Sequence, residues 1–105
     1  MSQAKFDKAV AIVQGLPKDG PIQPSTDEKL FFYANFKQAT IGKVNTSRPG
    51  LLDFTGKAKW DAWKEVEEKS KEDAQKDYVE KLLEILKKAD NEEAKKYIEE
   101  IEGAA

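Results

Sequence analysis

The widest apolar face in the chain belongs to residues 70–89, SKEDAQKDYVEKLLEILKKA. Apolar side chains recur there every three or four residues, which is the spacing of one face of an α-helix. They form two adjacent stripes, one of Ala74, Tyr78, Leu82 and Ile85 and one of Val79, Leu83 and Leu86. Ser70, followed by Asp73, is a helix-start signal. The segment therefore predicts a long amphipathic helix, the fourth of the chain.

The first helix is predicted over residues 3–15 and is also amphipathic. Its pattern consists of the N-cap Ser2 and the apolar residues Phe6, Val10 and Val13. Three of the chain's four prolines lie in residues 17–24, PKDGPIQP. Because proline interrupts helical hydrogen bonding, this composition predicts a loop after the first helix.

A second helix is predicted over about residues 26–41. Ser25 and Glu28 have the spacing of a capping box, and Gly42 is placed to stop the helix. Residues 43–55, KVNTSRPGLLDFT, show no clear periodicity and predict an ordered loop. A connection this long allows the next helix to begin near the other end of the second helix, so the topology is not a simple up-down-up-down bundle.

A shorter third helix is predicted over residues 56–67. Trp63 and Val66 share one of its faces, and Trp60 is displaced from them by one turn. Trp63 is expected in the core.

Residues 90–105 carry a further helical signal. Asp90 to Glu93 has the form of a new N-cap with a carboxylate at the third helical position. A new apolar stripe follows, made of Ala94, Tyr97, Ile98 and Ile101. The tail is therefore either a fifth helix or a kinked continuation of the fourth.

Composition excludes most classes of chemistry. The 105 residues suffice for one domain with a modest core, and they include no cysteine and no histidine. Disulfides, zinc or haem ligation, thiol nucleophiles and histidine-based catalysis are therefore excluded. The glycines lie too far apart for a phosphate-binding loop. We expect a protein that is not an enzyme and needs no cofactor and no metal.

No membrane or secretory segment is apparent. No apolar run approaches the roughly 20 residues of a membrane span, and the first residues, MSQAKFDKAV, lack the apolar stretch of a signal peptide. We expect a soluble protein of the cytoplasm.

Charge is unevenly distributed along the chain. Residues 1–28 carry three lysines and four acids (−1), residues 29–64 seven basic residues and two acids (+5), and residues 65–105 eight lysines and fourteen acids (−6). A basic segment within a net acidic chain favours a compact anionic ligand over a long polyanion, which the acidic segment would repel. Nucleic acid is accordingly not expected as a partner.

Aromatic and basic side chains alternate in two places. Tyr33 and Lys37 are four residues apart on one predicted helix face, with Phe36 beside them. Lys59 directly precedes Trp60. Aromatic faces next to ammonium groups fit a nucleotide, in which a purine stacks and phosphates pair with cations. The alternative interpretation is core aromatics flanked by surface lysines.

Four segments carry a family resemblance: YANFKQAT at 33–40, GKAKWDAW at 56–63, SKEDA at 70–74 and Tyr78-Val79. At these separations they strongly resemble the acyl-CoA-binding protein family over roughly residues 2–89. The resemblance implies an all-α four-helix bundle with up-down-down-up topology over residues 1–89 and a helix-rich C-terminal extension over residues 90–105. It also implies a non-catalytic intracellular carrier of long-chain acyl-CoA esters.

The resemblance assigns roles to individual residues. It implies that Tyr33 and Lys37 bind the 3′-phosphate of the CoA nucleotide, that Lys59 binds near the phosphates and adenine, and that Tyr78 stacks on the adenine ring. Phe36 retains an aromatic ring where relatives often carry tyrosine. Tyr78 also falls on the core stripe of its helix, so a packing role stays open for it. Core-edge packing for Tyr33 and ordinary surface positions for the two lysines are the corresponding alternatives.

Four further residues are secondary candidates. Relatives often carry a basic residue where this chain has Gln14 and Thr55, so we expect a weaker electrostatic contribution and a shallower dependence of binding on salt. Trp60 is expected at the border of the groove. Leu30 is expected either to line the acyl channel or to fill the core.

A different class of function also fits the pattern. A small helical interaction module would receive a partner helix in an apolar groove without binding any ligand.

For the carrier, the expected partners are long-chain acyl-CoA and, transiently, acyl-CoA-using enzymes or membranes. The chain is expected to be a monomer.

Overall fold

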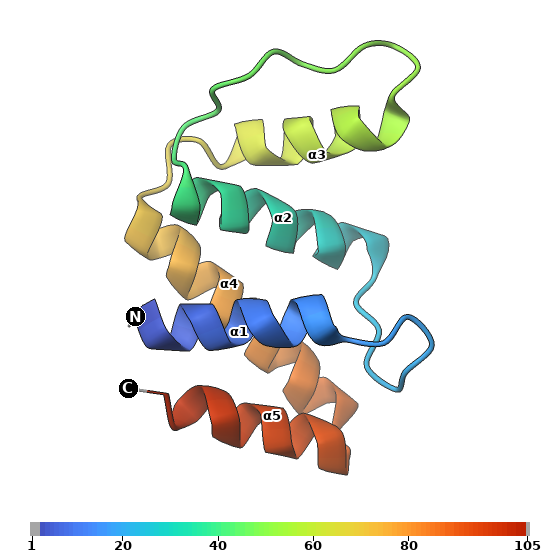
Figure 1. Ribbon diagram of the computed structural model, residues 1–105, viewed down its shortest axis with the longest axis vertical. Coiled ribbons are helices and arrows are strands. Elements are labelled where there is room, and N and C mark those ends of the chain that lie inside the picture. The colour runs from blue at the N-terminus through green and yellow to red at the C-terminus, as the bar shows by residue number, and fades with distance from the viewer. Residues whose placement is uncertain (1–2, 105) are drawn as a thin grey trace.

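The computed structural model describes residues 3–104 and consists, over that range, of helices and connecting loops (Figure 1). The helices are α1 (Gln3–Gly15), α2 (Thr26–Thr40), α3 (Phe54–Glu65), α4 (Lys71–Ala89) and α5 (Glu92–Glu102). Ser2, the expected cap of α1, lies outside the described residues. Within residues 3–104, no helix combines the length and the apolar character that a membrane span requires.

The order of helix directions is up-down-down-up for α1 to α4, which confirms the predicted all-α bundle. In Figure 1, α1 and α4 run away from the side on which the N-terminus lies, whereas α2 and α3 run back toward it. The long connection over residues 43–53 returns the chain along the molecule, so that α3 begins at the same end as α2. α4 packs against both α1 and α2, and α3 packs against α2.

Local capping determines where the helices start. The Ser25 hydroxyl accepts a hydrogen bond from the Glu28 N–H at 3.1 Å, and the Glu28 carboxylate accepts one from the Ser25 N–H at 2.8 Å, so the predicted capping box is confirmed. The Ser70 hydroxyl likewise accepts from the Asp73 N–H at 3.0 Å. Gly42 adopts a φ of 98° directly after α2, a conformation that costs glycine little and stops the helix.

The predicted start of α3 at Gly56 is wrong by two residues. The Asp53 side chain accepts a hydrogen bond from the Gly56 N–H at 3.0 Å and so caps a helix that begins at Phe54. The helix then ends at Glu65 rather than at residue 67.

The C-terminal segment forms a separate fifth helix. Asp90 has a left-handed backbone, with φ 47° and ψ 50°, which breaks α4 from α5. The cap of α5 is Asn91, whose side chain accepts from the Ala94 N–H at 2.8 Å. α5 packs against α1 and α4, and its Ile101 is completely buried.

The main core lies where α1, α2, α4 and α5 meet. The Tyr78 ring packs edge-on against Phe6, with centroids 5.4 Å apart, and lies 4.9 Å from the centroid of Phe32. α3 lies against the outer face of α2 and buries Trp63, as expected. The indole N–H of Trp63 donates to the carbonyl of Gly42 at 2.9 Å.

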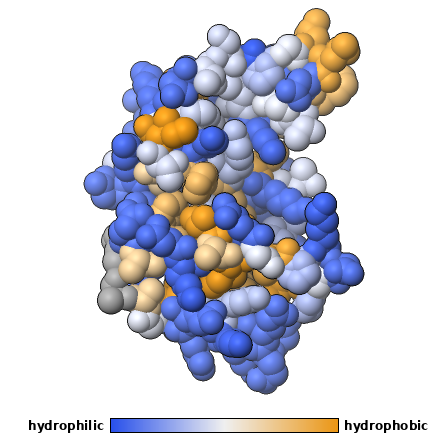
Figure 2. Space-filling view, viewed as in Figure 1, coloured by the Kyte–Doolittle hydropathy of each residue, from blue (hydrophilic) through white to orange (hydrophobic). Residues whose placement is uncertain are grey.

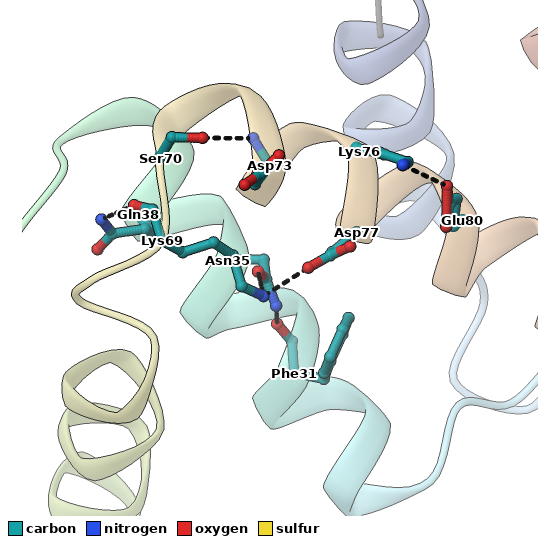
Figure 3. A network of polar contacts seen from close by, with 9 residues as sticks. All are labelled: Phe31, Asn35, Gln38, Lys69, Ser70, Asp73, Lys76, Asp77 and Glu80. Carbon is teal, nitrogen blue, oxygen red and sulfur yellow. Dashed lines mark hydrogen bonds and ion pairs between the residues drawn. The ribbon is translucent and has the colours of Figure 1, made fainter.

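A polar network fastens the α3–α4 connection to α2 (Figure 3). The Lys69 ammonium donates to the Asn35 side-chain oxygen at 2.7 Å and pairs with the Asp77 carboxylate at 2.7 Å. The Gln38 amide donates to the Lys69 carbonyl at 2.6 Å. Asn35 and Gln38 are buried, and these bonds satisfy the Asn35 side-chain oxygen and the Gln38 side-chain nitrogen, whereas the Gln38 side-chain oxygen has no hydrogen-bond partner among the described residues. The network joins α2 to the α3–α4 connection and, through Asp77, to α4.

We expect the substitution Ile101→Ala to lower the free energy of unfolding by about 2–4 kcal/mol, because it leaves a cavity between α5 and the bundle. The matched control is Glu99→Ala, an exposed position in the same helix, with an expected change within about 0.5 kcal/mol. Urea unfolding followed by circular dichroism measures both. Equal stability of the two variants would contradict the packing of α5.

Candidate functional site

A cavity of about 490 Å³ opens between the end of α1, the loop over residues 16–24 and α2. Its wall is largely apolar and includes Val13, Leu16, Ile22, Phe32, Phe36 and Tyr78. Figure 2 shows apolar surface between polar side chains near the middle of this face of the molecule. A cavity of this size and character fits a ligand with a substantial hydrocarbon part.

The charged side chains at the cavity are all cations. Lys18, Lys29 and Lys37 lie in its lining, and among residues 3–104 no carboxylate does. Positive charge next to an apolar wall favours an amphiphilic anion over a neutral lipid.

Two ammonium groups from different helices approach one aromatic ring at the cavity. Lys37 Nζ lies 5.7 Å from the centroid of the Tyr33 ring, and Lys59 Nζ lies 5.3 Å from it. Lys37 Nζ also lies 5.9 Å from the centroid of Trp63. The structure therefore brings Lys59 of α3 to Tyr33 and Lys37, which are neighbours on α2. Two like charges at one ring repel each other, so an anion bound between them would be stabilised by both.

Tyr78 is a core residue that also forms part of the cavity wall. It is 2% exposed and has aromatic neighbours on α1 and α2, so it takes the packing role that the sequence left open. Burial raises the pKa of the Tyr78 hydroxyl well above its usual range, so this group stays protonated at neutral pH. Its predicted stacking on adenine stays a prediction.

Phe36 and Gln14 both border the cavity. The Phe36 ring is partly buried and stacks on Phe6 with centroids 6.4 Å apart. Gln14 is exposed at the end of α1 and contributes a neutral amide at this rim.

Three of the secondary candidates lie away from the cavity wall. Leu30 lines a different depression of about 390 Å³ between α2 and α3. Thr55 is exposed in the first turn of α3. Trp60 is partly buried, and its indole N–H donates to the carbonyl of Thr46 at 3.0 Å, which ties the connection to α3. Lys59 is also absent from the cavity lining, but its ammonium group lies near the ring of Tyr33, which does line the cavity.

The structure adds residues that sequence reasoning did not select. Ile22 is 2% exposed and joins both the core and the cavity wall, although it lies in the proline-rich loop. The available signal was that Ile22 is the only aliphatic side chain, apart from proline, of the proline-rich segment 17–24, PKDGPIQP. Lys18 and Lys29 had no motif to distinguish them from other surface lysines.

A family model described as "Acyl CoA binding protein" matches residues 3–82. The chain belongs to this family. The resemblance seen in the sequence motifs is thereby confirmed. Among residues 3–104, no group of three or more acidic, cysteine or histidine side chains is placed to hold a metal ion.

Several family members are similar over most of this chain. "Acyl-CoA-binding protein homolog 3" of Caenorhabditis elegans is 50% identical over 86 residues, covering 82% of this chain and 74% of that protein. "Acyl-CoA-binding domain-containing protein 5" of Xenopus tropicalis is 48% identical over 86 residues, covering 82% of this chain but only 19% of that protein. The chain therefore spans less than a fifth of the length of this second relative.

Solved structures share the fold. The crystal structure of ACBP from Moniliophthora perniciosa is 76% identical, with a TM-score of 0.98, covering 99% of this chain and 98% of that one. Oryza sativa acyl-CoA-binding protein 2 is 40% identical, with a TM-score of 0.74, covering 85% of this chain and 92% of that one.

We expect Tyr78→Ala to lower the free energy of unfolding by about 3–5 kcal/mol, because removal of the ring opens a hole between α1, α2 and α4. Tyr78→Phe keeps the ring and should stay close to the parent protein. Thermal unfolding of the two variants measures the difference. If Tyr78→Ala were as stable as Tyr78→Phe, the packing role would be contradicted.

Proposed function

We propose that the protein is a carrier that binds long-chain acyl-CoA esters, holding the nucleotide at the cationic rim of the cavity and the acyl chain against its apolar wall. The observation that carries this proposal is the convergence of Lys37 and Lys59 on Tyr33 next to an apolar cavity. Membership of the acyl-CoA-binding protein family supports the ligand class.

The nucleotide contacts are assigned to the rim. Tyr33 and Lys37 bind the 3′-phosphate of the nucleotide. Lys59, which lies on α3, binds the other phosphates. A tyrosine hydroxyl and an ammonium can donate to one phosphate together, and charge-assisted bonds of this kind are stronger than neutral ones. Tyr78 and Phe36 supply aromatic surface for the adenine ring.

The acyl chain occupies the apolar part of the cavity. Val13, Leu16, Ile22 and Phe32 are apolar wall residues and carry no charge to desolvate. Burying about a dozen methylenes at ~0.8 kcal/mol each contributes on the order of 10 kcal/mol before the cost of association. Free CoA should accordingly bind far more weakly than the ester.

The protein holds its ligand without transforming it. It works as a monomer in the cytoplasm and exchanges acyl-CoA with the enzymes or membranes that use it. Enclosure of the acyl chain keeps this detergent-like molecule from aggregating, and the fold serves lipid transport rather than catalysis.

The direct test is calorimetric titration with hexadecanoyl-CoA, in parallel with free CoA and free hexadecanoate. The ester and the fatty acid are kept below their micelle concentrations. We expect one molecule of ester to bind per chain, with both fragments bound at least about a hundredfold more weakly, because each lacks half of the contacts. If the ester bound no better than its fragments, the carrier function would be rejected.

A second test addresses the rim. We expect Lys37→Gln and Lys59→Gln each to weaken binding of hexadecanoyl-CoA about tenfold, because each removes a charge-assisted contact. Lys95→Gln on α5 is the matched control, since it removes the same charge from an exposed position on another helix. The rim variants should also show a weaker dependence of affinity on salt. Affinities equal to that of the control would contradict the assignment of the rim lysines while leaving the carrier function open to the first test.

A further inference from the structure

Large apolar side chains stand in solvent at the start of α3. Leu51, Leu52 and Phe54 are 79%, 90% and 71% exposed, respectively, and together they are called the apolar tip. The Asp53 N–H donates to the Gly50 carbonyl at 3.1 Å, so the two leucines occupy the apex of a turn. Figure 2 shows an apolar protrusion at the corner where Figure 1 places the start of α3. Apolar side chains gathered at one exposed point mark an interaction surface, unlike apolar residues scattered singly.

The structure holds the apolar tip away from the core. The Arg48 guanidinium makes two hydrogen bonds of 2.9 Å to the Asp61 carboxylate, and Trp60 donates to the carbonyl of Thr46. Hydrogen bonding to Arg48 lowers the pKa of Asp61, so the carboxylate stays ionised at neutral pH. These contacts join residues that precede the turn to residues of α3 that follow it. The contacts between the connection and α3 therefore keep the tip exposed.

Charge distinguishes the end of the molecule that carries the apolar tip. Residues 43–65, which form the connection and α3, contain five basic residues and three acids, a net charge of +2, whereas residues 92–102 contain two lysines and five acids, a net charge of −3. Figure 1 places α3 and α5 at opposite ends of the long axis. Lys57 Nζ lies 5.0 Å from the centroid of the Phe54 ring, so one of these cations adjoins the tip itself. A molecule polarised in this way is oriented tip-first by a negative surface.

We propose that the apolar tip docks the protein on the surface of an anionic lipid bilayer. Leu51, Leu52 and Phe54 enter the boundary between headgroups and acyl chains, and Lys57 pairs with lipid phosphates. Apolar side chains flanked by a cation are the features that interfacial anchors use. A protein partner fits less well, because a stable protein interface needs about 800 Å² on each side, and three side chains on a convex turn offer much less.

This inference goes beyond the proposed acyl-CoA binding and is tested without that ligand. The probe is a suspension of vesicles made of equal parts phosphatidylglycerol and phosphatidylcholine, and cosedimentation measures the bound protein. The tip variant combines Leu51→Gln, Leu52→Gln and Phe54→Gln. Its control is Ile41→Gln, because Ile41 is 44% exposed and lies at the far end of α2.

We expect the parent protein and the Ile41→Gln control to bind these vesicles equally and the tip variant to bind at least about tenfold more weakly, because it removes three apolar side chains from the lipid contact. Lys57→Gln should weaken binding about fivefold, the contribution of one cation near an anionic surface. Pure phosphatidylcholine vesicles should bind the parent protein more weakly than the anionic ones.

A fluorescent label can locate the contact directly, because the chain has no native cysteine. An environment-sensitive dye on Leu52→Cys should shift to shorter wavelength when vesicles are added, whereas the same dye on Ile41→Cys should not. Equal shifts at the two positions would overturn the proposed orientation.

The remaining outcomes also decide the proposal. Absence of vesicle binding by the parent protein, or undiminished binding by the tip variant, would overturn it. Loss of self-association or of binding to an acyl-CoA-using enzyme in the tip variant, with vesicle binding unchanged, would identify a protein contact instead and overturn it as well. Titration of the tip variant with hexadecanoyl-CoA keeps the two proposals separate, since its affinity should equal that of the parent protein.

Discussion

The contact of the Tyr78 ring with Phe6 and Phe32 is the constraint on which the rest of the structure depends. One side chain of α4 thereby touches α1 and α2, the two helices that together with the loop over residues 16–24 form the cavity wall. Because core side chains pack closely, the position of this wall is set when the protein folds. The helical part of the wall is therefore preformed, and a ligand that contacts it does not have to order those side chains, which favours tight binding.

The cationic rim depends on a different set of contacts. Lys37 and Lys59 come from α2 and α3, so their approach to Tyr33 requires a fixed relation between these helices. Trp63 and the Gly42 carbonyl join α3 to the end of α2, and the Lys69 network fastens the α3–α4 connection to α2. The polar contacts hold the rim together against the repulsion between its lysines, whereas apolar packing maintains the cavity wall. The two halves of the site can thus be altered separately.

The helices could be predicted largely from local signals, because caps and apolar periodicity act over one turn. Ser25 with Glu28 located the start of α2, and the apolar stripe located α4. The start of α3 was misplaced because the cap of Asp53 acts on Gly56, the residue expected to begin the helix. The site was less predictable. Neither the burial of Ile22 nor the approach of Lys59 to Tyr33 has a periodic signature, since both arise where segments distant in sequence pack together.

The segment beyond the family match supports the cavity without entering it. Residues after position 82 complete α4 and form α5, and among the described residues none of them lines the cavity. α5 packs on α1 and α4, the helices that supply Val13 and Tyr78 to the wall. Burial of Ile101 therefore stabilises α1 and α4, and with them the part of the cavity wall that they form. The acidic α5 lies at the end of the long axis opposite α3, the helix that supplies Lys59.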